Sequence, residues 1–198
     1  MADERGCGRI EAEILGQRVV LETRQELFSP EHVDRGTLAM LKHVHIAPGL
    51  RIMDLGCGCG VVGIVAAKIA GEENVFLSDV DPTAVEVARR NAERNGVGGA
   101  RFFVSDGFRD VDASGFDLIL SNPPYQTDFS VAKGFIEKGF NRLKIGGRLY
   151  MVTKRRDWYK NKMISVFGGV AIHETDGYCV FVAERRGLQY ANRSPKRG

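Results

Sequence analysis

The feature that most constrains this chain is a glycine-rich turn at residues 54–60, which reads Asp-Leu-Gly-Cys-Gly-Cys-Gly. A β-rich run at 51–55 leads into it, and a pattern with helical periodicity follows at 61–70. Glycines at alternate positions let the backbone bend sharply and approach a ligand closely. The sequence therefore predicts a strand–turn–helix unit whose turn binds a ligand.

Strands and helices continue to alternate along the rest of the chain. The last two β-rich runs, 170–175 and 178–183, flank Asp176-Gly177, which is typical of a type I′ hairpin. This alternation predicts an α/β fold: a seven-stranded, mostly parallel sheet with one antiparallel strand and helices on both faces. The other predicted strands are 74–78, 101–105, 116–121 and 147–153, and the other helices are 82–95, 131–142 and 158–167.

The two ends of the chain depart from this pattern. Residues 11–22 alternate apolar and polar side chains around Gly16-Gln17 and predict a small hairpin, whereas 29–44 mix loop and helix. Residues 184–198 carry five Lys or Arg and one Glu, which suits either a solvated terminus or a handle for phosphates. The domains we expect are an N-terminal cap at 1–50, a core at 51–186 and a basic tail at 187–198.

The composition is that of an ordinary globular protein. Of the 198 residues, 43% are hydrophobic and 27% are charged, which suits one α/β domain. Residues 1–9 contain no apolar stretch typical of a signal peptide, and no run approaches the roughly 20 apolar residues of a membrane span. The four cysteines form no Cys-x-x-Cys pair, so we expect reduced thiols, no metal site and a cytoplasmic protein.

Acidic residues stand at the ends of three predicted strands. Asp54 closes the first strand, where a phosphate cradle would avoid a carboxylate but a cationic ammonium or sulfonium group would favour one. Asp79 closes the second, 19 residues beyond Gly60, where a carboxylate takes ribose hydroxyls. Together they predict a nucleoside cofactor without phosphates. Asp106, after the third strand, either accepts a hydrogen bond from an adenine amino group or caps a turn.

A second motif, Asn-Pro-Pro-Tyr, occupies residues 122–125, directly after the strand at 116–121. Its two prolines stiffen the loop and leave the loop carbonyls exposed. The side-chain oxygen of Asn122 and the carbonyl of Pro123 can each accept one N–H of a conjugated amino group and so aim its lone pair at a methyl donor. Tyr125 can stack on a planar target. We therefore predict Asn122, Pro123 and Tyr125 as catalytic residues.

With these two motifs, the chain resembles the class I S-adenosylmethionine methyltransferases, and within them the small-domain type that includes guanine-N2 methyltransferases of small-subunit ribosomal RNA. The resemblance extends over nearly the whole chain and includes Phe28-Ser29, Asp34-Arg35-Gly36-Thr37 and Gly177-Tyr178. It implies a Rossmann-like methyltransferase fold that binds S-adenosyl-L-methionine. The residues that we place at the cofactor are Asp54, Gly56, Gly58, Gly60, Asp79, Val80 and Asp106.

Four residues are candidates for contacts with the substrate. Lys154, Arg155 and Arg156 end the last parallel strand, next to a Trp and a Tyr. This cluster suits phosphate binding and stacking on a flipped nucleotide, or a solvated loop beside a half-buried tryptophan. Phe28 suits either a cover for the cofactor or target base, or core packing.

The sequence thus predicts an S-adenosylmethionine-dependent methyltransferase that acts on the exocyclic amine of a guanine in ribosomal RNA, with RNA or a ribosomal subunit as its partner. Protein glutamine-N5, adenine-N6 and small-molecule N-methyltransferases are the alternatives. Relatives of the first carry a helical substrate-binding domain and those of the second a recognition module, for which residues 1–50 leave too little room. A non-catalytic RNA-binding scaffold is the alternative of another class, which a cofactor titration would separate.

Overall fold

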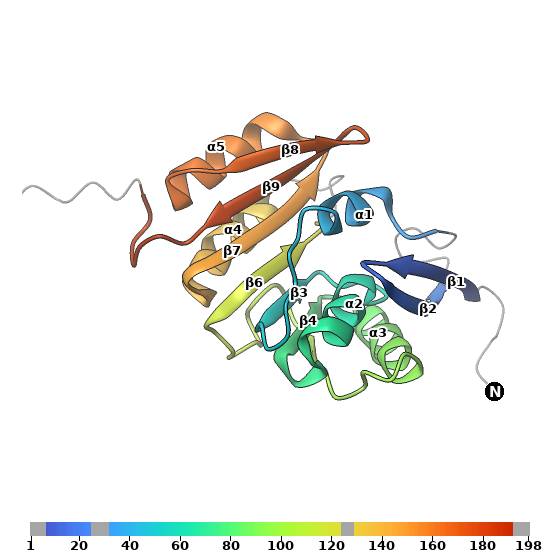
Figure 1. Cartoon of the computed structure of the whole chain (residues 1–198). Coiled ribbons are helices and arrows are strands. Elements are labelled where there is room, and N and C mark those ends of the chain that lie inside the picture. Colours follow the sequence, from blue (N-terminus) through green and yellow to red (C-terminus); the bar gives the residue numbers. More distant parts are fainter. Residues whose placement is uncertain (1–6, 25–31, 124–128, 192–198) are drawn as a thin grey trace, which may run out of the picture.

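The computed structural model describes residues 7–24, 32–123 and 129–191, which contain two β-sheets and the helices around them (Figure 1). The smaller sheet is the hairpin of β1 (Cys7–Ile14) and β2 (Gln17–Arg24). The larger sheet has seven strands in the order β5-β4-β3-β6-β7-β9-β8. Its strands are β3 (Ile52–Leu55), β4 (Val75–Asp79), β5 (Arg101–Val104), β6 (Phe116–Ser121), β7 (Leu143–Thr153), β8 (Ala171–Thr175) and β9 (Tyr178–Glu184).

The helices fall between these strands in the chain. They are α1 (Arg35–Leu41), α2 (Val61–Ala70), the 3-10 helix η1 (Glu72–Asn74), α3 (Pro82–Arg94), α4 (Ser130–Arg142) and α5 (Arg156–Phe167). Asp81 caps α3 by accepting a hydrogen bond from the backbone N–H of Thr83 at 2.8 Å, and Pro82 occupies the first helical position. The capping signal that predicted this helix is therefore confirmed.

The large sheet is mostly parallel, as predicted. Strands β3 to β7 pair in parallel, and β9 runs antiparallel to both of its neighbours, β7 and β8. The turn between β8 and β9 has positive φ at both central residues, 53° at Asp176 and 78° at Gly177, as a type I′ turn requires. The predicted hairpin thus supplies the single antiparallel strand of this sheet, one position inside its edge.

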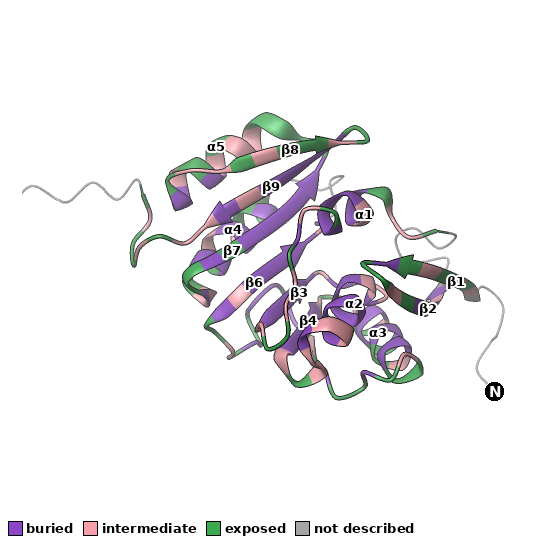
Figure 2. Ribbon diagram, in the orientation of Figure 1, coloured by how far each residue is buried: buried purple, intermediate pink, exposed green. Residues whose placement is uncertain are grey.

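Helices cover both faces of the large sheet because its strands alternate their side chains between two apolar clusters. Along β3, Ile52 belongs to the cluster shared with α1, α2 and α3, whereas Met53 belongs to the cluster shared with α4 and α5. Both residues are fully buried. Figure 2 shows the central strands of the large sheet mostly buried, whereas most of β1 and β8 is exposed or intermediate. The core therefore lies in two layers, one on each side of the sheet.

The N-terminal hairpin docks on the molecule through Asn91 in α3 and Asn95 at the end of that helix. Asn95 exchanges two hydrogen bonds with the backbone of Val20, at 3.0 and 2.7 Å, and Asn91 exchanges two with Glu22, at 2.7 and 2.8 Å. The amide side chains thereby pair with β2 as a neighbouring strand would. The hairpin turn is Leu15-Gly16, one residue earlier than the sequence suggested.

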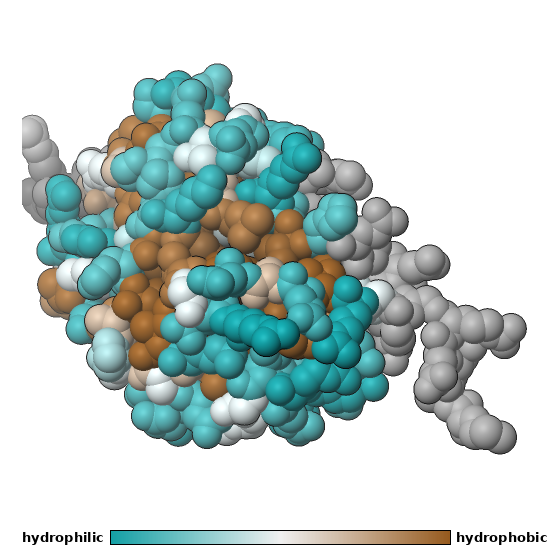
Figure 3. All heavy atoms as spheres, turned by 45° about the vertical axis from the view of Figure 1, so that its right-hand side comes forward, coloured by the Kyte–Doolittle hydropathy of each residue, from teal (hydrophilic) through white to brown (hydrophobic). Residues whose placement is uncertain are grey.

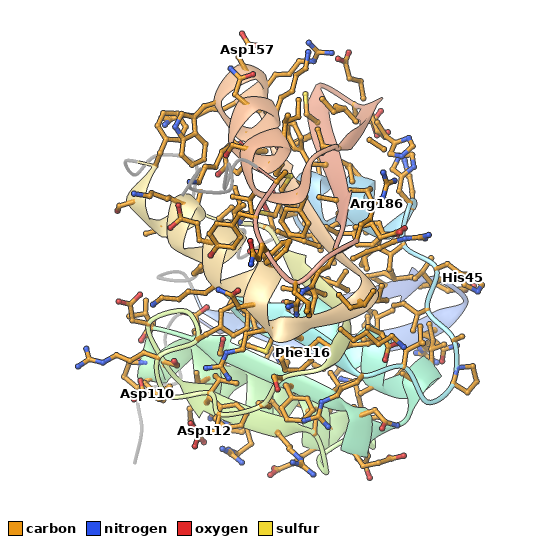
Figure 4. All side chains as sticks on the ribbon, turned by 90° about the vertical axis from the view of Figure 1, so that its left-hand side faces the viewer. His45, Asp110, Asp112, Phe116, Asp157 and Arg186 are labelled. Atoms are coloured by element: carbon orange, nitrogen blue, oxygen red, sulfur yellow. The ribbon has the colours of Figure 1, made fainter. Side chains whose placement is uncertain are left out.

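In the core, most predicted boundaries lie within one residue of the observed ones, but β7 and α5 begin earlier than predicted. Strand β7 begins at residue 143 and not at 147, because the Gly146-Gly147 pair lies in an irregularity of the β6–β7 pairing and not in a turn before the strand. Helix α5 begins at 156 and not at 158. Figure 4 shows Asp157 at the outer end of this helix, where its carboxylate complements the positive end of the helix dipole.

The surface and interior have the expected division of side chains. Figure 4 shows Phe116 among the inner side chains at the start of β6; its ring meets Phe76 edge-on, with 5.2 Å between the centroids. In the space-filling view of Figure 3, an apolar band crosses the middle of the face and hydrophilic residues border it. Of the helices in the described ranges, none combines the length and apolarity needed to cross a membrane.

Candidate active site

A pocket of about 440 Å³ lies at the carboxyl ends of the parallel strands β3, β4, β5 and β6. The chain passes from β3 outward to β4 and β5, and then returns to β6 on the other side of β3. The pocket therefore occupies a topological switch point, the usual ligand site of an open α/β sheet. Its volume lies within the range of about 300–1,000 Å³ that is typical of small-molecule sites.

The glycine turn after β3 forms one wall of this pocket. Gly56 and Gly58 line it, and Gly58 has φ 53° with open space where a Cβ would stand. Gly60 serves the packing of the helices instead, since at φ 89° its added Cβ would come within 3.0 Å of the Ala88 Cβ in α3. The structure thus brings two of the three predicted glycines to the pocket, and the third allows α2 to pack on α3.

Asp79 holds the glycine turn and faces the same pocket from the end of β4. One carboxylate oxygen accepts from the backbone N–H of Gly58 at 2.9 Å, and the other from that of Asp81 at 3.1 Å. Val80 also lines the pocket and is 68% exposed, so its apolar side chain is available to a flat ligand. Both residues predicted at this position therefore lie at the pocket.

Asp54 is a buried acid in the pocket wall. Its side chain is only 3% exposed, and one oxygen accepts from the backbone N–H of Gly63 at 2.8 Å. Burial, together with the charge of Asp79, raises the pKa of Asp54 to about 7. A cationic ligand group would compensate for that burial. Burial also affects the neighbouring residue Cys59. It raises the pKa of the Cys59 thiol to about 11, so this thiol stays neutral and is a poor nucleophile.

Asp106 lines the pocket beyond β5 and is exposed there. The turn in which it lies is fastened by its neighbour, since the Ser105 hydroxyl accepts from the backbone N–H of Asp110 at 2.9 Å. Within the described residues, the Asp106 side chain makes no hydrogen bond. This arrangement favours a ligand-facing role for Asp106 over that of a turn cap.

Asn122 lies at the end of β6 with its amide fixed in one orientation. Its Nδ2 donates to Oδ1 of Asp34 at 2.6 Å and to Oγ1 of Thr37 at 3.0 Å. A carboxylate only accepts, so the amide nitrogen must face Asp34 and the amide oxygen must face away from it. No described residue donates to that oxygen. Asn122 and Pro123 both line the pocket, as the glycine turn does.

Sequence reasoning gave no role to several residues that line the pocket. Asp34 and Thr37 belong to a stretch noted only for its resemblance to the small-domain methyltransferases, yet they orient Asn122 across 88 and 85 residues of chain. Phe135 of α4 lies beneath the glycine turn, 3.8 Å from where a Cβ on Gly56 would stand. No local pattern marked Phe135, because its helix looked like any amphipathic helix.

The predicted basic cluster lies on the surface and does not line the pocket. The Lys154 ammonium stands 4.9 Å from the ring centre of Tyr178, and the Arg155 guanidinium 5.0 Å from that of Phe129. Arg156 forms an ion pair with Glu174 at 3.1 Å. The three basic residues therefore have three different partners and do not form one joint site.

Of the three basic residues, Arg155 contacts a residue next to a helix that lines the pocket. Arg155 lies over the ring of Phe129, the residue directly before α4. Val131 and Phe135 of that helix line the pocket. The Phe129 ring also stacks on Trp158, with 4.3 Å between the centroids. Phe28 and Tyr125, which were also predicted at the site, lie outside the described residues.

The chain is similar to known methyltransferases over most of its length. Residues 18–182 match the family model described as methyltransferase small domain. Ribosomal RNA small subunit methyltransferase C of Pseudomonas putida is 32% identical over 164 residues, which are 80% of this chain and 49% of that protein. YbxB of Bacillus subtilis, an uncharacterized protein, is 30% identical over 167 residues, which are 80% of this chain and 82% of that protein.

Among solved structures, a 16S rRNA guanine-N2 methyltransferase from T. thermophilus, in complex with AdoMet and guanosine, superposes with a TM-score of 0.84. The sequences are 25% identical, and the match covers 91% of this chain and 51% of that one. The chain thus spans about half the length of both named methyltransferases, but most of the length of YbxB. The family model and this likeness agree on the fold and on the cofactor.

Proposed function

Because this chain belongs to the methyltransferase small domain family, we propose that it methylates the exocyclic N2 amine of a guanine in ribosomal RNA. As a member of that family, it is an S-adenosyl-L-methionine-dependent methyltransferase. The guanine and the RNA are the proposed parts. The likeness to a 16S rRNA guanine-N2 methyltransferase in complex with guanosine supports both. The observation that carries an amine as the target is the fixed amide of Asn122, whose oxygen accepts from no described residue in the pocket that also holds the glycine turn.

The residues of the pocket fit S-adenosyl-L-methionine. We propose that Gly56 and Gly58 approach it closely, that Asp79 accepts from its ribose hydroxyls, and that Val80 packs on its adenine. Asp54 supplies the negative charge that its ammonium or sulfonium group calls for. When bound, this cofactor supplies an electrophilic methyl group. Asp106, whose side chain bonds to none of the described residues, is placed to accept from the adenine amino group.

The chain's own groups position the target amine. The oxygen of Asn122 and the carbonyl of Pro123 each accept one of its two N–H groups. An amine conjugated to a purine ring is a weak nucleophile, because its lone pair is delocalised into the ring. Two acceptors in fixed places direct the lone pair out of the ring plane and stabilise the positive charge that grows on nitrogen. Asp34 and Thr37 prevent Asn122 from turning its donor side toward the amine.

The surface beside the pocket suits RNA. Arg155 lies over the ring of Phe129, next to α4, whose residues line the pocket. We propose that Lys154 and Arg155 contact phosphates, and that Arg156 contributes through its ion pair with Glu174, which it exchanges for a phosphate. We also retain as proposals the cap at 1–50, the core at 51–186 and the basic tail at 187–198.

The direct test is to identify the methylated unit. The full chain is incubated with methyl-labelled S-adenosyl-L-methionine and, separately, with RNA, small ribosomal subunits and protein, and the labelled pool is then digested. We expect N2-methylguanosine from RNA or subunits. Label in N6-methyladenosine or in N5-methylglutamine would establish one of the two rival methyltransferases instead. Cofactor binding without label in any pool would favour the RNA-binding scaffold.

A further inference from the structure

Besides Asp54, Asp79 and Asp106, the pocket holds a further acidic side chain, which contacts Asn122. Asp34 lines the pocket from the N-cap of α1, and its Oδ1 accepts both from Asn122 Nδ2 at 2.6 Å and from the backbone N–H of Thr37 at 2.9 Å. Oδ2 accepts from no described residue. Among the described residues, the carboxylate thus has one oxygen bonded to the protein and one oxygen without a donor, in the pocket that Asn122 also lines.

The fold makes room for this carboxylate. A Cβ on Gly36 would come within 2.9 Å of Asp34 Oδ1 and within 2.9 Å of Cε1 in the Tyr178 ring. Any larger residue at 36 would therefore displace Asp34 or the ring. Thr37 is buried and ties the same cluster to β6 through Asn122. The position of the Asp34 side chain is thus fixed by its own helix α1 and by Asn122 at the end of β6.

We infer that Asp34 makes the site specific for guanine, because its Oδ2 accepts the N1–H that stands next to the N2 amine. This inference rests on the proposed function and names the group that selects the base. With the acceptors at Asn122 and Pro123, the pocket then offers three acceptors in a row. Guanine is the base that presents three donors there: two on N2 and one on N1.

The rival substrates lack this arrangement. The atom next to the adenine N6 amine is N1, which has a lone pair and no hydrogen, and the atom next to the amine of a glutamine amide is a carbonyl oxygen. Either one would place an acceptor against the Asp34 carboxylate. Asn122 and Pro123 alone accept any primary conjugated amine, so they do not discriminate. A misplaced acceptor leaves a desolvated carboxylate without its hydrogen bond, which is costly.

The test compares two nucleosides that carry the same N2 amine. Guanosine has N1–H, whereas 2-aminopurine riboside has a bare N1 and is fluorescent, so its binding is measured directly and that of guanosine by competition. Both are titrated into the full chain in the presence of S-adenosylhomocysteine. We expect wild type to bind guanosine at least about 10-fold more tightly, as the loss of a hydrogen bond to a charged group predicts.

Asp34→Asn exchanges the free acceptor for a donor. Its one remaining oxygen still accepts from Thr37 and Asn122, and Asn caps helices as well as Asp does, so the variant should fold. We expect the preference for guanosine to fall to about unity or to reverse. Thr37→Val is the matched control, because it removes a hydroxyl that orients Asn122 but keeps the Asp34 carboxylate. It should weaken the binding of both nucleosides alike and leave the ratio of their affinities unchanged.

Three results would overturn the inference: an equal affinity of wild type for the two nucleosides, binding of neither, or an unchanged ratio in Asp34→Asn. S-adenosyl-L-methionine affinity, measured on both variants, verifies that the pocket is intact. The proposed function fails separately. If wild type forms N2-methylguanosine in RNA while Asp34→Asn keeps its preference, only the role of Asp34 is wrong. If the methylated unit is adenine or glutamine, both proposals are wrong.

Discussion

At the scale of single residues, the candidate site depends on acids and amides that are held in one orientation. Asp79 fastens the glycine turn through the N–H of Gly58, and Asp34 fastens the amide of Asn122. In each case a backbone or amide donor limits where the acidic side chain can lie. Such preorganised acceptors cost no rearrangement when substrate binds, which is why their contribution to the rate can be large.

We expect Asn122→Ala to leave S-adenosyl-L-methionine binding intact and to lower kcat by about 10- to 1,000-fold, because the variant loses an acceptor for the target amine. Calorimetric titration of the cofactor and single-turnover methylation measure the two effects. Asp79→Ala is the opposite control, since it should lower the affinity for the cofactor. Full turnover in Asn122→Ala would show that the amide does not position the amine.

Asp54 gives the site a pH dependence. Its pKa is raised from 3.8 to about 7, so the folded protein without ligand holds a proton that the unfolded chain releases near pH 4. The stability from this group is therefore full below about pH 4 and is lost as the pH rises toward 7. A cationic cofactor favours the ionised form of Asp54. The affinity for the cofactor should therefore rise with pH, whereas the stability from this group falls.

We accordingly expect the affinity for S-adenosyl-L-methionine to rise between pH 5.5 and pH 7.5, roughly the window of this titration, with proton release on binding. Calorimetry in buffers of different ionisation enthalpy measures that release. Asp54→Asn keeps the size of the side chain and removes the charge, so its weaker binding should be nearly independent of pH. A flat profile in wild type would exclude Asp54 as the partner of the cationic group.

At the scale of elements, the sequence predicted what depends on local pattern and missed what depends on packing. The bounds of α2 and β6 followed from apolar runs next to glycine and proline signals. The contact of Asp34 with Asn122 spans 88 residues and had no local signature. Likewise, the hairpin at 11–22 was expected, but nothing in its alternation showed that α3 would hold it.

The docking of that hairpin makes a prediction for Asn91, which is 0% exposed and also donates to the carbonyl of Cys59 at 2.9 Å. Asn91→Ala leaves the N–H and C=O of Glu22 without their partners. We expect the free energy of unfolding to fall by about 2 kcal/mol and hydrogen exchange to accelerate in β2. Denaturant titration and exchange mass spectrometry measure these effects.

Asn141→Ala is the matched control, because Asn141 is exposed and makes its side-chain bonds at the surface. This substitution should lower the free energy of unfolding by no more than about 0.5 kcal/mol. Equal stability and equal exchange in the two variants would mean that the asparagine pairs do not hold the hairpin.

At the scale of the whole molecule, the pocket is a joint product of the core and the N-terminal segment. The core supplies the glycine turn and Asn122, while Ile10 of β1 and the residues around the start of α1 close the other side. The motifs of the first set lie together at one pocket because they end strands of a parallel sheet, whose carboxyl ends meet at one edge. The second set could be placed only once the three-dimensional packing was known.

The central claim is that one pocket brings the methyl donor and the target amine together. The most direct measurement is a crystal structure of the chain with S-adenosylhomocysteine and guanosine. We predict the homocysteine derivative over Gly56 and Gly58, and the guanine N2 within hydrogen-bonding distance of Asn122 Oδ1, facing the sulfur. Guanosine bound outside this pocket, or with N2 turned away from the sulfur, would contradict the account.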